Sequence, residues 1–221
     1  MTARWILAIV ALTAGGCGGP GHQTTGVYLL LDTSGTYHEE LDKAEQIINY
    51  TLSRLDALDS FAVARIDTGS FSEKDIIAKV TLDDRPSAAN QQKREFAARI
   101  GDFLKGSPTS RYTDITGGLL QAVEFLNEKE TTRRTVFIFS DLKEDLEKGY
   151  VRDIPVPLDG IEVVALNVTK LRSDNIDPRE YLDRLETWRE RVESQGGSWR
   201  VINDLDRLES LLTPERRFAT L

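Results

Sequence analysis

The chain has 221 residues, of which 40% are hydrophobic, and its 28 basic and 36 acidic side chains give a formal net charge of -8. This length and apolar content suffice for one sizeable core, and neither an internal repeat nor a low-complexity block indicates a second. The acidic balance, with no dense Lys/Arg cluster, argues against a nucleic-acid partner.

The N-terminal segment has the layout of a secretory signal. Arg4 is followed by the apolar run Trp5–Leu12 and then by small residues up to Cys17. The run is too short to cross a bilayer as a permanent helix. Cys17 is the only cysteine of the chain, so it has no intramolecular disulfide partner and is either a free thiol or chemically modified.

This segment resembles the signal of bacterial lipoproteins, in which the cysteine after the small residues is lipidated and becomes the first residue of the mature protein. Ala14 stands where that family most often has Leu, so ordinary cleavage nearby stays an alternative. The resemblance implies a signal peptide at 1–16, a lipidated Cys17 opening a flexible tether at 17–25, and a folded domain at 26–215. The lipid would hold the domain at a membrane of the cell envelope, on the periplasmic or the outer side.

The first strand is predicted at Val27–Leu31, an apolar run typical of a strand buried on both faces of a parallel sheet. Asp32, Ser34 and Thr36 follow it, one carboxylate and two hydroxyls spaced two residues apart. These side chains converge only if the chain turns there, and Gly35 is predicted to permit that turn.

The same turn has a purely structural interpretation. Thr36 and Glu39 form a capping-box pattern, in which both side chains bond backbone N–H groups at the start of a helix. An amphipathic helix is predicted next, over His38–Leu58, and its dipole adds positive potential beside the turn. The turn by itself therefore leaves helix capping and the binding of a metal or phosphate both open.

The middle of the chain predicts two more strands and a helix. Phe61–Ile66 and Ile76–Leu82 are joined by a link short enough for a hairpin, so the second of them should run antiparallel at a sheet edge. Apolar residues at helical spacing then predict a helix over Asn90–Leu104.

A polar loop, Thr109–Gly118, leads into the next predicted helix. Thr113 or Thr116 is expected to cap that helix, which leaves the other hydroxyl spare. Thr135–Asp141 is then a second apolar run that ends in a carboxylate, Asp141, and it repeats the layout of the first strand.

The last part predicts a strand at Ile161–Leu166, a helix at Pro178–Ser194, a strand at Trp199–Ile202 and a short helix at Leu205–Leu212. The apolar spacing of the longer helix predicts its inner face: Leu182, Leu185, Trp188 and Val192.

Alternating strands and helices predict an α/β fold, doubly wound, with a mostly parallel central sheet, one antiparallel edge strand and helices on both faces. In such sheets ligands bind beyond the carboxyl ends of the strands, where the strand order reverses. Five oxygen-bearing side chains are predicted to meet at that edge: Asp32, Ser34, Thr36, Thr113 and Asp141.

This constellation resembles the metal-ion-dependent adhesion site of von Willebrand factor type A (VWA) domains, a Rossmann-like family whose pattern is Asp-x-Ser-x-Ser, a separate Thr, and an Asp usually followed by Gly. The resemblance covers roughly Gly26 to Leu212. Thr36 replaces the last Ser and keeps the hydroxyl, whereas Leu142 replaces the Gly and should affect loop shape more than metal chemistry.

The resemblance implies that Ser34, Thr36 and Thr113 bind the ion directly or nearly so, and that Asp32 and Asp141 reach it partly through water. Hydroxyl and carboxylate oxygens without thiol or imidazole suit Mg²⁺, or Mn²⁺ or Ca²⁺, and disfavour zinc. Neutral hydroxyl ligands leave much of the ion's charge uncancelled, so an open coordination position should attract an Asp or Glu of a protein partner. The expected function is a membrane-anchored extracytoplasmic binding module and not an enzyme.

Two alternatives remain. A magnesium-dependent phosphatase of the haloacid dehalogenase type also places an Asp after an apolar first strand, but it needs a second Asp two residues on, where this chain has Ser34. The other alternative is a structural scaffold domain whose site binds no metal.

Overall fold

The computed structural model describes residues 23–35, 37, 40–106, 109–149, 151–171, 173–203 and 207–208. Their elements follow one another as β1 (Thr25–Asp32), α1 (Leu41–Arg54), β2 (Ser60–Ile66), η2 (Glu73–Asp75), β3 (Ile76–Thr81), α2 (Pro86–Gly106), α3 (Ile115–Lys129), β4 (Arg133–Phe139), β5 (Ile161–Leu166), η3 (Ser173–Asn175), α4 (Pro178–Glu193) and β6 (Ser198–Ile202). Within these residues, no helix is both long and apolar enough to cross a membrane.

The six strands form one sheet in the order β3-β2-β1-β4-β5-β6. All neighbouring pairs are parallel except β2 and β3, which are antiparallel at one edge. The predicted fold class, including its antiparallel edge strand, is therefore confirmed. Since the chain leaves β1 toward β2 and later returns to the other side of β1 as β4, the strand order reverses between β1 and β4, where open α/β sheets bind ligands.

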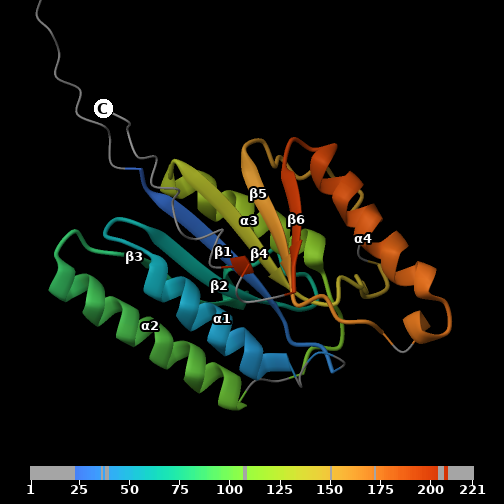
Figure 1. Ribbon diagram of the computed structural model, residues 1–221, viewed down its shortest axis with the longest axis horizontal. Coiled ribbons are helices and arrows are strands. Elements are labelled where there is room, and N and C mark those ends of the chain that lie inside the picture. Colours follow the sequence, from blue (N-terminus) through green and yellow to red (C-terminus); the bar gives the residue numbers. More distant parts are fainter. Residues whose placement is uncertain are drawn as a thin grey trace, which may run out of the picture.

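The central strand β1 is buried on both faces because its apolar residues alternate between two cores. Val27, Leu29 and Leu31 pack into the core beneath α1 and α2. Tyr28 and Leu30 pack into the core beneath α3 and α4. Figure 1 shows these helix pairs on opposite sides of the sheet, so β1 ends in a position that both layers surround.

Helix α3 approaches β1 closely at its first turn. A Cβ atom built on Gly118 would lie 2.7 Å from Cδ2 of Leu30, closer than side-chain carbons approach in folded proteins. The glycine therefore lets the start of α3 lie directly against β1, and this brings the loop before the helix to the carboxyl end of that strand.

Two sequence predictions about helix ends are wrong. Helix α1 ends at Arg54, four residues before the predicted Leu58. Helix α3 is capped by neither Thr113 nor Thr116, because Oδ1 of Asp114 accepts the N–H of Gly117 at 2.8 Å. A carboxylate at the N-cap interacts more favourably with the helix dipole than a hydroxyl does.

The inner face of α4 is also corrected at one position. Leu182 is 61% exposed, whereas Trp188 and Val192 are buried. Tyr181 and Leu185 pack against the same core as these two, and the stripe therefore runs through positions 181, 185, 188 and 192 at helical spacing. The helix predicted at Leu205–Leu212 lies largely outside the described residues, of which only 207–208 belong to it.

Buried ion pairs hold the loops at the carboxyl edge of the sheet. Asp114, 1% exposed, accepts hydrogen bonds from Nε and Nη2 of Arg152 at 2.9 and 2.6 Å. Asp174, also 1% exposed, is bound by two guanidinium nitrogens of Arg184, which lower the pKa of its carboxyl group. Bidentate pairs of this kind fix the orientation as well as the distance of the two groups, so the loops that carry them are set in place by α4 and by the 143–158 segment.

We predict that Arg152→Met lowers the free energy of unfolding by about 3 kcal/mol, because the Asp114 carboxylate is left buried without its cation. Arg179→Met is the matched control, since the pair of Arg179 with Asp177 is 86% and 45% exposed; it should change stability by less than about 0.5 kcal/mol. Urea unfolding measures both. Equal losses of unfolding free energy in the two variants would show that the buried Asp114–Arg152 pair contributes no more to stability than the exposed pair.

Candidate metal centre

A pocket of about 290 Å³ opens at the carboxyl edge of the sheet, and three of the five predicted ligands line it: Ser34, Thr113 and Asp141. They come from three separate loops, after β1, before α3 and after β4. Residues 79 positions apart in the chain, Ser34 and Thr113, thus share one cavity. The predicted convergence of these segments on one edge is what the structure shows.

Asp32, the last residue of β1, joins the turn that follows β1 to the turn that follows β4. Its side chain is 1% exposed. Oδ1 accepts the backbone N–H of Ser34 at 2.8 Å, and Oδ2 accepts the hydroxyl of Ser140 at 2.6 Å. Each oxygen keeps a second lone pair. Asp32 therefore fixes the two turns that border the pocket relative to each other.

Asp141 reaches the pocket from the turn after β4. It is 3% exposed, and its Oδ1 accepts the N–H of Lys143 at 2.8 Å. Its backbone carbonyl accepts a hydrogen bond from Nε of Arg184 at 2.8 Å. Helix α4 therefore holds the backbone of Asp141 in place through Arg184, which Asp174 in turn orients.

Leu142 adopts the left-handed backbone conformation, with φ of 64°. This is the position at which the adhesion-site pattern usually has Gly, and a non-glycine residue there costs on the order of 1 kcal/mol. The cost is offset because the leucine side chain is buried and its carbonyl accepts the indole N–H of Trp188 at 2.9 Å. The loop thus accommodates a leucine in the left-handed conformation.

Thr113 lies on a loop that pairs with the chain beyond Asp141. Thr113 and Asp145 exchange two backbone hydrogen bonds, at 2.7 and 3.0 Å. The residue is 4% exposed. Among the described residues its hydroxyl has no hydrogen-bond partner, so this oxygen is available to a ligand in the pocket.

The electrostatics of the site suit a cation. Burial raises the pKa of Asp141, and the neighbouring carboxylate of Asp32 raises it further, while the N–H of Lys143 and the charge of Arg184 act in the opposite direction. A positive ion in the pocket would offset the repulsion between two buried carboxylates that interact in this way. The residues present fit a hard divalent cation.

Acidic, His and Cys side chains alone do not make the site: in the part of the chain that the structure describes, no three of them gather closely enough to hold a metal. Binding at this pocket would depend on hydroxyl oxygens as well as carboxylates. That donor set suits Mg²⁺, which retains several waters, and does not suit zinc.

Two predicted functional residues lie outside the described residues, namely Thr36 and the lipidation candidate Cys17. The turn after β1 differs from expectation in one respect, because the φ angle of Gly35 is not in the left-handed region. The turn therefore does not depend on the left-handed freedom of glycine.

Sequence reasoning missed two residues that shape the site. Ser140 lies inside the predicted run Thr135–Asp141 and its hydroxyl donates to Asp32; a polar residue directly after a buried strand was the available signal. Arg184 stands among many charges on α4, and nothing local distinguishes it.

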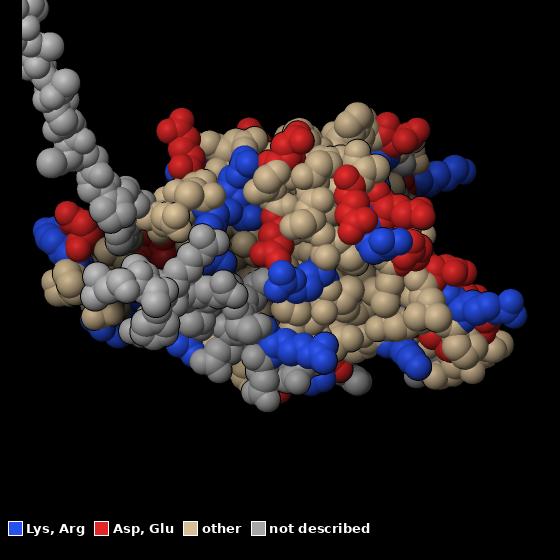
Figure 2. All heavy atoms as spheres, turned by 45° about the horizontal axis from the view of Figure 1, so that its top comes forward, with Lys and Arg blue, Asp and Glu red and all other residues tan. Residues whose placement is uncertain are grey.

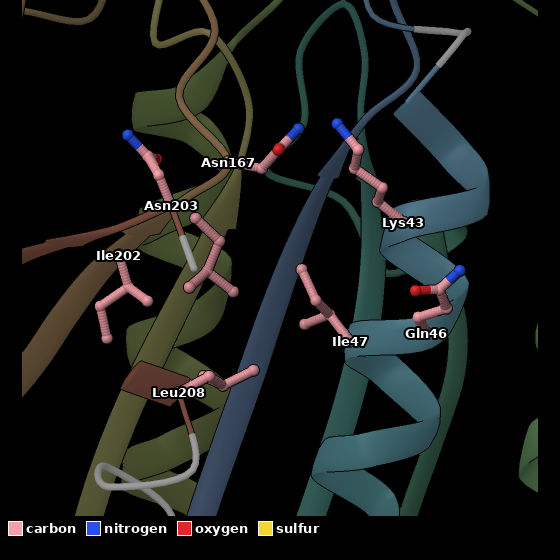
Figure 3. Close-up of a pocket in the computed structure, with 8 residues that line it drawn as sticks. Lys43, Gln46, Ile47, Asn167, Ile202, Asn203 and Leu208 are labelled. Carbon is pink, nitrogen blue, oxygen red and sulfur yellow. The ribbon is translucent and has the colours of Figure 1, made fainter. Parts of the chain in front are cut away.

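A second pocket, of about 340 Å³, lies between α1 and the ends of β5 and β6 (Figure 3). Ile47, Ile202 and Leu208 give it an apolar lining, and amides and Lys43 stand at its rim. Asn167, in this rim, donates from Nδ2 to the hydroxyl of Tyr37 at 3.0 Å. No carboxylate lines this pocket among the described residues, so it is not a second metal site.

The sequence itself matches no family model and no curated protein. Solved structures do match. The pilus adhesin SpaC of Lactobacillus rhamnosus GG, in its open conformation, aligns with a TM-score of 0.56 and 13% identity over 87% of this chain and 29% of the adhesin. A von Willebrand factor type A protein of Catenulispora acidiphila aligns with a TM-score of 0.50 and 13% identity over 86% of this chain and 41% of that one.

The present chain thus spans less than half the length of either structure. At 13% identity, these alignments show a similar fold and do not indicate the activity. The strand order and the switch point between β1 and β4 agree with the structural alignments, and the chain therefore has a VWA-like fold.

Proposed function

We propose that this domain captures a protein partner through a divalent ion, Mg²⁺ in the first instance, held in the pocket at the carboxyl edge of the sheet. The observation that carries the proposal is the convergence of Ser34, Thr113 and Asp141 on one pocket, with Asp32 bonded to the turns on both sides. The similarity in fold to a pilus adhesin supports a role in protein interaction.

In this proposal the hydroxyls of Ser34, Thr36 and Thr113 hold the ion, and Asp32 and Asp141 reach it partly through water. The bound ion supplies a coordination position that accepts a carboxylate oxygen from an Asp or Glu of the partner. The protein's own contribution is to keep Ser34, Thr113 and Asp141, which lie on three loops, at fixed places through the bonds of Asp32 and the buried pairs of Asp114 and Asp174.

A phosphatase is the second candidate, and one observation favours it. Lys143 lines the pocket, which sequence reasoning did not anticipate, and a lysine there would suit a phosphate. The general acid is still lacking, because the residue two positions after Asp32 is Ser34, whose N–H is bonded back to Asp32. A scaffold domain that binds no metal is the third candidate.

We further propose that Cys17 anchors the mature protein to a membrane of the cell envelope. The apolar run before it, the small residues and the absence of any other cysteine support this.

The first prediction concerns the ion. Mg²⁺ should raise the unfolding midpoint of the unmodified domain, since an ion that binds only the folded state stabilises it by mass action, by about 2.7 kcal/mol at a hundredfold excess over Kd. The shift should shrink in Thr113→Ala and in Asp32→Ala. Thr187→Ala, which removes an exposed threonine from α4, is the control and should keep the full shift.

Thermal scans at rising Mg²⁺ and in chelator measure these shifts. Calorimetry is paired with a capture assay in the same buffer. If the unmodified domain binds no Mg²⁺ up to millimolar concentrations and still captures a partner, the metal-dependent mechanism is wrong and the domain is a scaffold that binds no metal.

The second prediction is that purified protein does not hydrolyse phosphate esters, since the site pairs no nucleophile with a positioned general acid. A chromogenic phosphate ester with Mg²⁺ is the assay. Turnover that disappears in Asp32→Ala would establish the phosphatase and displace the adhesion role.

The third prediction is that Cys17→Ala releases the domain from membranes or stalls its processing. Cell fractionation and the mass of the mature protein report this. A variant that remains membrane-bound and is cleaved as before would disprove the lipid anchor.

A further inference from the structure

Two basic side chains stand at the rim of the pocket. Arg111 and Lys143 both line it, and both are exposed. They belong to the two loops that Thr113 and Asp145 join through paired backbone hydrogen bonds. Each cation therefore occupies a loop whose backbone is held in place.

These two cations differ from the basic residues behind the pocket. Arg152 is paired with Asp114, Arg184 with Asp174, and Arg191 with Glu144. Among the described residues, Arg111 and Lys143 form no salt bridge. Elsewhere the surface mixes both signs, as Figure 2 shows for one face, in a chain of net charge -8. The rim thus presents two exposed cations on an acidic protein.

The charges of the pocket leave a surplus for a partner. A divalent ion is balanced by Asp32 and Asp141, and Asp145, which also lines the pocket, offsets one of the two rim cations. With the ion, these side chains have a surplus of one positive charge, which a carboxylate bound to the ion would balance in number without pairing with the exposed Arg111 and Lys143. A second acidic group beside the first would pair with those two cations directly.

We infer that the site takes an acidic protein segment, in which a second Asp or Glu next to the metal-binding carboxylate is held by Arg111 and Lys143. This inference rests on the proposed function and specifies its partner. The apolar side chain of Leu171, which also lines the pocket, offers a surface for the methylene groups of such a segment.

A free phosphate is a poorer fit to the same charges. Phosphate sites usually draw on the free backbone N–H groups of a helix N-terminus. At the start of α3, the N–H of Gly117 is bonded to Asp114 and the N–H of Thr116 to Glu144. Two carboxylates therefore already occupy the position where a phosphate would be cradled.

Fluorescence anisotropy with two labelled peptides tests the inference. One peptide has a single Glu, and the other has three consecutive Glu in an otherwise identical sequence. In the presence of Mg²⁺ the second should bind the unmodified domain more tightly. The double variant Arg111→Gln/Lys143→Gln should remove that advantage, a loss of about 2- to 10-fold for two exposed ion pairs, and should lessen the salt dependence of binding.

The control is Lys79→Gln/Lys129→Gln, which removes two positive charges from β3 and from the end of α3, away from the pocket, and should retain the advantage. Because the double variant at the rim removes cations near the ion, its Mg²⁺-dependent thermal shift should be kept or slightly increased.

The outcomes separate the two proposals. A Mg²⁺-dependent thermal shift, with equal binding of both peptides or an unchanged preference in the rim variant, would overturn this inference and leave the proposed function standing. Absence of any Mg²⁺ effect on stability and on both peptides would overturn the proposed function and this inference with it. Inorganic phosphate that competes as well as the triple-Glu peptide would show that the rim selects charge alone, and would overturn the inference by itself.

Discussion

The site depends above all on the hydrogen bond between Ser140 and Asp32. Two residues 108 positions apart are joined at 2.6 Å, and the other oxygen of the same carboxylate holds the backbone of Ser34. Both partners are buried, so the bond is shielded from water and expensive to leave unmade. The turns after β1 and β4 therefore have one relative position, and side chains from both can serve one ligand.

The parts of this arrangement that depend on local pattern could be predicted. The runs Val27–Leu31 and Thr135–Phe139 are strands because both of their faces are apolar, and the carboxylates that follow them had to lie at one edge once the strands were parallel. The loop with Thr113 followed from the same reasoning, since a helix that crosses back must begin at that edge.

The parts of the arrangement that depend on residues distant in the sequence could not be predicted. Asp114 caps α3 and binds Arg152, which is 38 positions away, and Arg184 reaches the carbonyl of Asp141 from α4. In the sequence these are single charges among many, and their partners are fixed only when the loops have folded. Leu182 shows the same limit for apolar residues. Helical spacing alone assigned it to the inner face of α4, but its side chain lies outside the core.

The direction of β1 has a consequence for any anchor upstream of it. The strand begins at the edge of the sheet opposite to the pocket and covers eight residues, or about 26 Å at 3.3 Å per residue, before it ends at Asp32. A lipid attached to the segment before Thr25 would thus hold the domain by one pole and present the pocket at the other. The sheet would then act as a spacer between the anchored end of the domain and the pocket.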